Sequence, residues 1–374
     1  MPSRRQFMQT AAVGLAAGVV PARARERDVE IQPTSRRDVI DWHGHWVGPH
    51  VVELLASRPS PRPPQGPGWF DIDARLRQMD IAGVGHQVLS WVGASFDGVL
   101  TAEDARPLWR AQNDDVAAVV GRLPARFSGL ASLPTANVAW AAEELERAHR
   151  DLGLIGAVLP LDAFITLEGA RTLAPIFDVA QRHKSHLFVH RGLAGPAVPG
   201  QRAELGATNP YFGLAAPDGG PLRSGTPGDY TAARTALITA AHLATGVITL
   251  ALSDLLDAYP DVTVQVAMLG GAIAFVAEQV QMAADEAGHP IPAERWRRVY
   301  LDTGQSGRGP RSVALAAKVF GADRILFGSD SGPTEAIGPV IQSVQQAALT
   351  DAEKTQIFSG NGRRVLAAKG VSIA

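Results

Sequence analysis

The chain has 374 residues, of which 46% are hydrophobic and 19% are charged, so it can form a substantial core and is not globally disordered. Its 35 basic and 37 acidic residues give a formal net charge of −2, which offers no basic field for nucleic acid and no obvious attraction to a membrane surface. The absence of cysteine excludes disulfides, thiolate nucleophiles and cysteine zinc sites, so any transition metal must be bound by His, Asp or Glu.

The N-terminal segment, residues 1–24, is predicted to be a twin-arginine signal peptide. It combines the pair Arg4 and Arg5 with an apolar run over residues 11–20 and a small-x-small cleavage sequence. The alternatives are a short amphipathic helix or a membrane anchor, but the run is too short and too rich in Ala and Gly to span a bilayer. We therefore expect export by the twin-arginine machinery to the periplasm or another exported location. No stable membrane anchoring should remain after the signal is removed, and residues 25–37 should form a linker.

From Asp38 onwards, short apolar runs alternate with amphipathic or Ala-rich segments. This alternation is typical of βα units, and eight strands indicate a closed (β/α)8 TIM barrel of class α/β. We expect one barrel domain over residues 38–374. The expected strands are Val39–Trp42, Gln87–Trp91, Phe127–Leu133, Gly156–Pro160, His186–His190, Val262–Met268, Val299–Asp302 and Arg324–Ser329. The expected helices are Ile72–Ala82, Ala105–Arg122, Val138–Leu152, Glu168–His183, Ala232–Tyr259, Ala272–Ala287 and Arg311–Phe320.

Two segments interrupt this pattern. Arg58–Gly68 is rich in Pro and Gly and follows the first strand, and Leu193–Tyr230 is a long loop after the fifth strand. A long loop inside a compact domain is usually functional, and in a barrel it lies over the C-terminal face, where active sites are built. We predict that Leu193–Tyr230 forms a lid, with an oligomer contact as an equally weighted alternative.

The first strand carries the sharpest local motif, Asp41-Trp42-His43-Gly44-His45. Residues i and i+2 of a strand point to the same face, so His43 and His45 can reach one metal ion. A lone His-x-His pair is a weak signal, and its support here comes from the ends of other strands.

Two further strand ends carry matching groups. His190 closes an apolar strand, and Asp330 directly follows the last strand, where a carboxylate is costly to bury without a cation. Three imidazoles and one carboxylate form a site for one divalent metal ion, zinc above all, with iron, cobalt or manganese as alternatives. In the zinc case, an open coordination position would hold a water whose pKa falls towards ~7. Asp330 can act as the catalytic proton shuttle for that water.

The four residues in these strand positions resemble the metal-ligand set of the amidohydrolase superfamily. More narrowly, the chain resembles the amidohydrolase-related (amidohydrolase 2) group typified by aminocarboxymuconate semialdehyde decarboxylase. The resemblance implies a metal-dependent hydrolase-type barrel, and the group includes nonoxidative decarboxylases, hydrolases and a hydratase acting on small carboxylated or aromatic compounds. Related barrels often dimerise, so we expect a homodimer by analogy. The matching segments are 39–49, 74–80, 83–84, 87–90, 187–190, 269–271, 300–303, 326–330 and 359–361.

One position departs from the family. The family places a His before the Gly-Gly of the sixth strand, and this chain has Met268 there. Methionine cannot move a proton, and its thioether is a poor ligand for a hard metal site. Three alternatives follow. The metal and Asp330 activate the water alone, another group such as His242 or a lid residue replaces the missing His, or the barrel binds a ligand without the usual chemistry. We favour the first.

Three residues near these strand ends are candidates for substrate binding. Arg191 could bind a substrate carboxylate or form a structural ion pair. Trp46 could line the pocket or pack in the core, and Asp302 could face the site or cap the following Gly-rich turn. The remaining histidines are expected to be solvated or structural, namely His50, His86, His149, His183, His186 and His289.

These features predict a metal-dependent enzyme acting on a small organic, carboxylated or aromatic substrate. Export slightly favours hydrolysis through a metal-activated water, whereas the family resemblance favours nonoxidative decarboxylation. A metal-free member, in which the same His and Asp groups act as acid and base, is a further alternative. From another class, a non-catalytic ligand-binding or scaffold barrel remains the competing hypothesis, although four intact metal-type residues speak against it.

Overall fold

The computed structural model describes residues 38–57, 67–91, 100–192, 231–304, 309–332 and 337–373. All of them belong to one compact unit of the chain, residues 33–374. The predicted signal peptide and linker, and the loop Leu193–Tyr230, lie outside the described residues.

The strands are all parallel and pair in chain order. β3 and β4 are two halves of one strand that is interrupted at Leu130, so the barrel has eight strand positions. These positions are the eight that the sequence predicts. The strands are β1 (Val39–His45), β2 (Val84–Ser90), β3 (Phe127–Gly129), β4 (Ala131–Ser132), β5 (Gly156–Pro160), β6 (His186–His190), β7 (Thr263–Val266), β8 (Val299–Asp302) and β9 (Ile325–Leu326).

The barrel closes where the segment after β9 meets β1. The backbone N–H of Trp42 donates to the carbonyl of Phe327 at 2.8 Å, and that of His45 donates to Ser331 at 2.6 Å. Gly44 and Ser331 also form a parallel bridge. These contacts join the first and last strands, so the predicted TIM barrel is confirmed.

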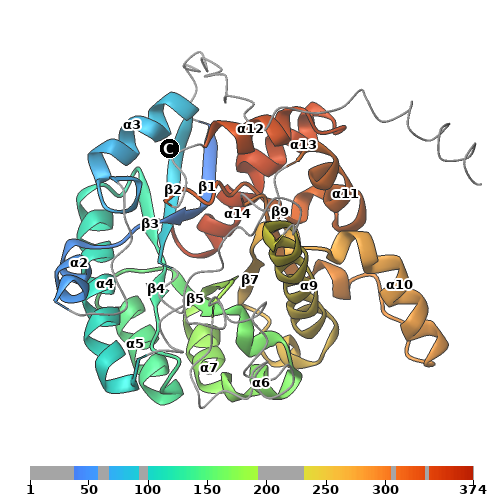
Figure 1. The fold of residues 1–374 in the computed structure, drawn as a ribbon, viewed down its shortest axis with the longest axis horizontal. Helices are drawn as coiled ribbons and strands as arrows, with labels where there is room; N and C mark the ends of the chain where they lie inside the picture. The colour runs from blue at the N-terminus through green and yellow to red at the C-terminus, as the bar shows by residue number, and fades with distance from the viewer. Residues whose placement is uncertain are drawn as a thin grey trace, which may run out of the picture. The chain divides into compact units, whose positions relative to one another are not determined.

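Helices surround the strands (Figure 1). The predicted helix Glu168–His183 is wrong in one respect, because the structure divides it at Leu173. Pro175 lies in the first turn of the second piece, where its missing N–H is tolerated, whereas in the interior of one long helix it would remove a hydrogen bond. The helices are α2 (Pro49–Ala56), α3 (Ile72–Ala82), α4 (Ala102–Arg122), α5 (Val138–Arg150), α6 (Leu167–Thr172), α7 (Ala174–His183), α9 (Thr231–Leu252), α10 (Ile273–Glu286), α11 (Pro310–Phe320), α12 (Gly338–Gln345), α13 (Asp351–Thr355) and α14 (Asn361–Ala368).

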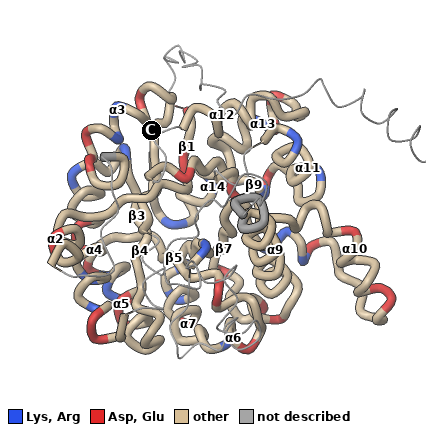
Figure 2. Tube along the Cα trace, in the orientation of Figure 1, with Lys and Arg blue, Asp and Glu red and all other residues tan. Residues whose placement is uncertain are grey.

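The core lies in the strands and on the helix faces that cover them. Leu187, Phe188 and Val189 of β6 are fully buried, as expected for a strand covered on both faces. Most Lys, Arg, Asp and Glu positions lie on the helices and loops around the strands (Figure 2). Among the described residues, none of the helices is both long and apolar enough to cross a bilayer.

Candidate metal centre

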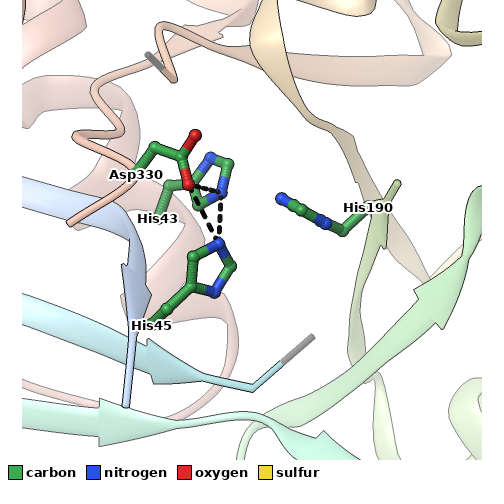
Figure 3. Close-up of side chains that lie close together, drawn as sticks. All are labelled: His43, His45, His190 and Asp330. Carbon is green, nitrogen blue, oxygen red and sulfur yellow. Dashed lines mark hydrogen bonds and ion pairs between the residues drawn. The ribbon is translucent and has the colours of Figure 1, made fainter. Parts of the chain in front are cut away.

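His43, His45, His190 and Asp330 form a single cluster at the C-terminal ends of their strands (Figure 3). One potential ligand atom from each residue lies within 4.8 Å of all the others. Nε2 of His43 is 3.0 Å from Nε2 of His45, and Oδ1 of Asp330 is 3.3 Å and 3.1 Å from these two nitrogens. The structure thus brings together the four residues that the strand ends predict as metal ligands.

His190 faces this group from β6, on the other side of the cluster (Figure 3). Its Nδ1 is 2.9 Å from the carbonyl of Arg191, to which it donates, so Nε2 keeps its lone pair. Nε2 is buried and has no hydrogen-bond partner among the residues that the structure describes. A buried polar atom without a partner is costly, and a metal ion would satisfy it. This nitrogen and the donor set around it fit a divalent transition metal.

Asp302, the last residue of β8, lies directly behind His43. Its Oδ1 is 3.0 Å from Nδ1 of His43 and also accepts the backbone N–H groups of Met268 and Gly304. Its Oδ2 accepts a bond from Gln265 at 2.6 Å. The bond from Gly304 is the cap of the following turn that was the alternative for Asp302, and protein donors reach both of its oxygens. A substrate contact of Asp302 stays a prediction. Its contacts are those of a carboxylate that orients a metal-binding histidine.

Next to His45, Arg75 of α3 is fully buried. Its guanidinium donates to the carbonyls of His45 and Gly68 and, at 2.9 Å, to Oγ of Ser331. It also bonds Gln87, whose amide continues to the carboxylate of Asp41. Burial lowers the pKa of Arg75 to about 10, although Asp41 counters this effect, so the side chain stays charged at neutral pH.

Burial and the surrounding charges pull the pKa values in the cluster in opposite directions. Burial lowers the pKa of His45 and, most strongly, that of His190. Burial also lowers the pKa of His43, but Asp302 and Asp330 outweigh it and raise this pKa to about 10. For Asp330, burial raises the pKa, and its contacts with His43 and His45 more than reverse that, so the carboxylate is charged.

The backbone around the cluster is unusual at two places. Asp330 has a φ of 58°, in the left-handed region that a short polar residue tolerates better than a bulky one. Gly328 allows a close approach, since a Cβ there would lie 2.7 Å from the Cβ of His43. A non-glycine residue in the left-handed region, as at Asp330, is often found at functional sites.

The aromatic neighbour of the cluster differs from the one considered in the sequence. Trp46 is 2% exposed and donates its indole N–H to Phe70 at 3.1 Å, so the structure favours its core alternative. Trp69 instead stacks on the His45 ring, with centroids 6.0 Å apart and planes at 21°. Trp69 was not among the predicted site residues, because it adjoins the Pro/Gly-rich segment Arg58–Gly68, which has no strand or helix pattern. An aromatic residue directly after that segment was the only available signal.

The remaining candidates lie around the same end of the barrel. Arg191 is half-buried, and burial lowers its pKa while Asp330 counters the effect. Burial, helped by Arg191, lowers the pKa of His242 on α9 to about 4. Met268 is buried with a φ of 56°, and its backbone N–H bonds Asp302. Substrate binding by Arg191, and replacement of the family His by His242, stay predictions.

The chain is similar to known proteins over most of its length. Residues 40–367 match the family model described as Amidohydrolase. A gamma-resorcylate decarboxylase from a Polaromonas species is 26% identical over 302 residues, which are 78% of this chain and 86% of that protein. A 2-amino-3-carboxymuconate-6-semialdehyde decarboxylase from Dictyostelium discoideum is 32% identical over 121 residues, or 32% of this chain and 34% of that protein.

Solved structures resemble the fold. A 5-carboxyvanillate decarboxylase from Sphingomonas paucimobilis matches with a TM-score of 0.66 and 22% identity, covering 89% of this chain and 99% of that one. A dihydroxybenzoic acid decarboxylase from Polaromonas, solved with bound manganese, matches with a TM-score of 0.64 and 20% identity, covering 88% of this chain and 96% of that one. At such identities the likeness establishes the fold.

Proposed function

Because the chain belongs to the amidohydrolase family and is therefore a metal-dependent hydrolase or carboxy-lyase, we propose that it is a nonoxidative decarboxylase of a hydroxylated aromatic acid. The observation that carries the proposal is the convergence of three imidazole nitrogens and one carboxylate oxygen within 4.8 Å. The relatives named above are decarboxylases, which favours carboxyl removal over the hydrolysis that export suggested. The hydrolytic prediction is therefore not retained.

A divalent metal ion held by His43, His45, His190 and Asp330 would act as a Lewis acid that polarises an oxygen of the substrate. The donor set accepts zinc, which the sequence favours, and also manganese, which a structural neighbour contains. The metal content of the purified protein, and its activity after reconstitution with zinc or manganese, decide which metal is native.

Side chains of the protein transfer the proton that decarboxylation needs and orient the substrate. Decarboxylation breaks the bond between the ring and the carboxyl carbon, releases that carbon as CO2 and leaves the electron pair of the bond on the ring. The ring carbon that carried the carboxyl group must then receive one proton. We assign this proton transfer to Asp330, which is buried beside His43 and His45 and is charged in the free protein. It would first take a proton from the hydroxyl group of the bound substrate and then deliver that proton to the ring carbon. Arg191 is the candidate to bind a carboxylate of the substrate, because it follows His190 and its guanidinium matches a carboxylate fork.

The test uses the purified chain reconstituted with manganese or zinc. We expect CO2 release from 2,6-dihydroxybenzoate or 5-carboxyvanillate, and no turnover of simple esters or lactones. His190→Ala should lose metal and activity while remaining folded, and His289→Ala, at an exposed histidine, should keep both. Ester or lactone hydrolysis without CO2 release, or full activity in metal-free protein, would contradict the proposal.

Met268 favours one alternative, a barrel that binds ligand without turning it over. The family's proton-handling His is replaced there by a buried thioether side chain. This alternative predicts stoichiometric metal and saturable binding of the aromatic acid without CO2 release. Measurable turnover by the metal-loaded wild type excludes it.

A further inference from the structure

A line of hydrogen-bonded side chains crosses the barrel interior and ends on the cluster. It begins at Thr263 and His186, the first residues of β7 and β6, whose Oγ1 and Nδ1 atoms are 3.0 Å apart. Nε2 of His186 is 2.9 Å from Oε1 of Gln265, and Nε2 of Gln265 is 2.6 Å from Oδ2 of Asp302. Asp302 then contacts Nδ1 of His43 at 3.0 Å.

Only one assignment of donors and acceptors satisfies every hydrogen bond in this line. Asp302 is only an acceptor, so the Gln265 amide must turn its NH2 group towards it. The amide oxygen of Gln265 then accepts from Nε2 of His186, which leaves Nδ1 of His186 to accept the Thr263 hydroxyl. Burial lowers the pKa of His186 to about 3, so the ring is neutral, as this pattern requires.

These groups occupy a place that barrels normally fill with branched apolar side chains. His186, Gln265, Asp302 and His43 are all fully buried. A buried polar line stabilises the protein only when each member is satisfied, and otherwise it costs stability. Gln265 also prevents the line from acting as a proton wire, because a neutral amide does not readily take up and release protons. The contacts of Gln265 therefore fit a role in orienting Asp302.

We infer that Gln265 and His186 are positioning residues of the metal centre, which fix Asp302 so that Asp302 holds the ring of His43 with Nε2 towards the metal. The inference rests on the proposed metal site. Gln265 supplies the side-chain donor to Oδ2 of Asp302, while His43, Met268 and Gly304 donate to Oδ1. His186, packed against Trp42 with ring centroids 4.6 Å apart, keeps the Gln265 amide in its orientation.

The test measures the dissociation constant of Mn²⁺ by chelator competition, beside the thermal midpoint of the metal-free protein. Gln265→Leu, which has similar volume but no donor, should weaken Mn²⁺ binding by about tenfold, as loss of an outer partner of a metal ligand typically does. His186→Phe should weaken it by less, because the bond between Gln265 and Asp302 survives. The rise in thermal midpoint on adding Mn²⁺ should shrink in the same order.

Asn113→Leu is the matched control, since it also replaces a buried amide by an apolar side chain. Asn113 bonds Ser132 and Glu144 and none of the four cluster residues. It should lower the thermal midpoint and leave Mn²⁺ affinity unchanged.

Wild-type Mn²⁺ affinity in Gln265→Leu, or an equal loss in Asn113→Leu, overturns the inference and leaves the proposed function standing. If Gln265→Leu does not fold, unchanged Mn²⁺ affinity in His186→Phe overturns the inference, and a reduced one supports it. Failure of the wild type to bind either Mn²⁺ or Zn²⁺ overturns the proposed function and this inference together.

Discussion

His43 lies between two carboxylates, with Nδ1 3.0 Å from Asp302 and Nε2 3.3 Å from Asp330. Without a metal, its pKa of about 10 means that it holds an extra proton at neutral pH. A metal ligand must present a free lone pair, so this proton has to leave when the ion binds. Burial lowers the pKa values of His45 and His190, which favours the neutral form that a metal ligand needs.

Metal affinity should therefore rise with pH. Since the His43 proton is bound below about pH 10 in the metal-free protein, raising the pH makes its release easier. We expect the Mn²⁺ association constant to increase about tenfold per pH unit between pH 6 and pH 8, the slope for one released proton. Titrations at pH 6, 7 and 8 measure this slope, and a flat profile would mean that metal binding displaces no proton.

At Asp330, metal binding and proton transfer can be separated by one substitution. Asp330→Asn keeps an oxygen near the metal but removes the group that carries the proton. Loss of a general acid–base group lowers the rate by about 10²–10⁴-fold. We expect a fall in kcat of this size with metal still bound, measured by CO2 release and by metal content per chain. Near-wild-type kcat would assign the proton transfer to another residue, for which His242 is the next candidate.

Helix α3 reaches the cluster through a single side chain. Ile72, Arg75, Met79 and Ala82 are all buried, so Arg75 belongs to the apolar stripe of this helix. An arginine within such a stripe is the signal by which the sequence could have identified it. From the stripe it holds the carbonyls of His45 and Gly68 and the hydroxyl of Ser331.

Arg75→Lys should destabilise the protein by about 3 kcal/mol, because a lysine cannot reproduce the fork and leaves several buried groups without partners. The exposed neighbour Arg77 provides the control, and Arg77→Lys should change stability by at most about 0.5 kcal/mol. Urea unfolding of the metal-free proteins measures both. Equal midpoints for the two variants would remove Arg75 from the support of the site.

The metal ligands were predictable from sequence because local apolar runs mark the strands, and a His or an Asp stands in or directly after three of these runs. His43, His45, His190 and Asp330 could all be found in this way. Asp302 was recognised as a strand end, but its partners could not be, because they come from β1 and β7. His186 and Gln265 interrupt apolar strands, yet only the barrel brings them to one line, so His186 was expected to be merely structural or solvated.

At the scale of the whole molecule, the barrel was predictable because eight apolar runs alternate with helical segments. The structure adds what periodicity does not contain: the break before Pro175, the helices after residue 337 and the closure of β1 against residues 327–331. That closure depends on backbone hydrogen bonds between distant segments, which leave no local pattern.

Export remains a prediction from residues 1–24, and it can be tested on the full chain. Arg4→Lys combined with Arg5→Lys should retain folded protein in the cytoplasm, because the twin-arginine pair is the feature that the export machinery reads. Fractionation followed by metal analysis of each fraction measures the result. An unchanged periplasmic share in the double variant would point to another route or to no export.

The joining of β1 to the segment after β9 has a consequence for how the protein is made. Two ligands of the cluster lie on the first strand and a third, Asp330, lies in the segment after the last strand. A nascent chain on the ribosome therefore lacks a complete site until residues 325–331 have emerged. Metal capture by the complete site would then follow the emergence of Asp330 from the ribosome. A chain truncated before Asp330 would lack one of the four ligands. Its low metal content would distinguish it from the full-length protein.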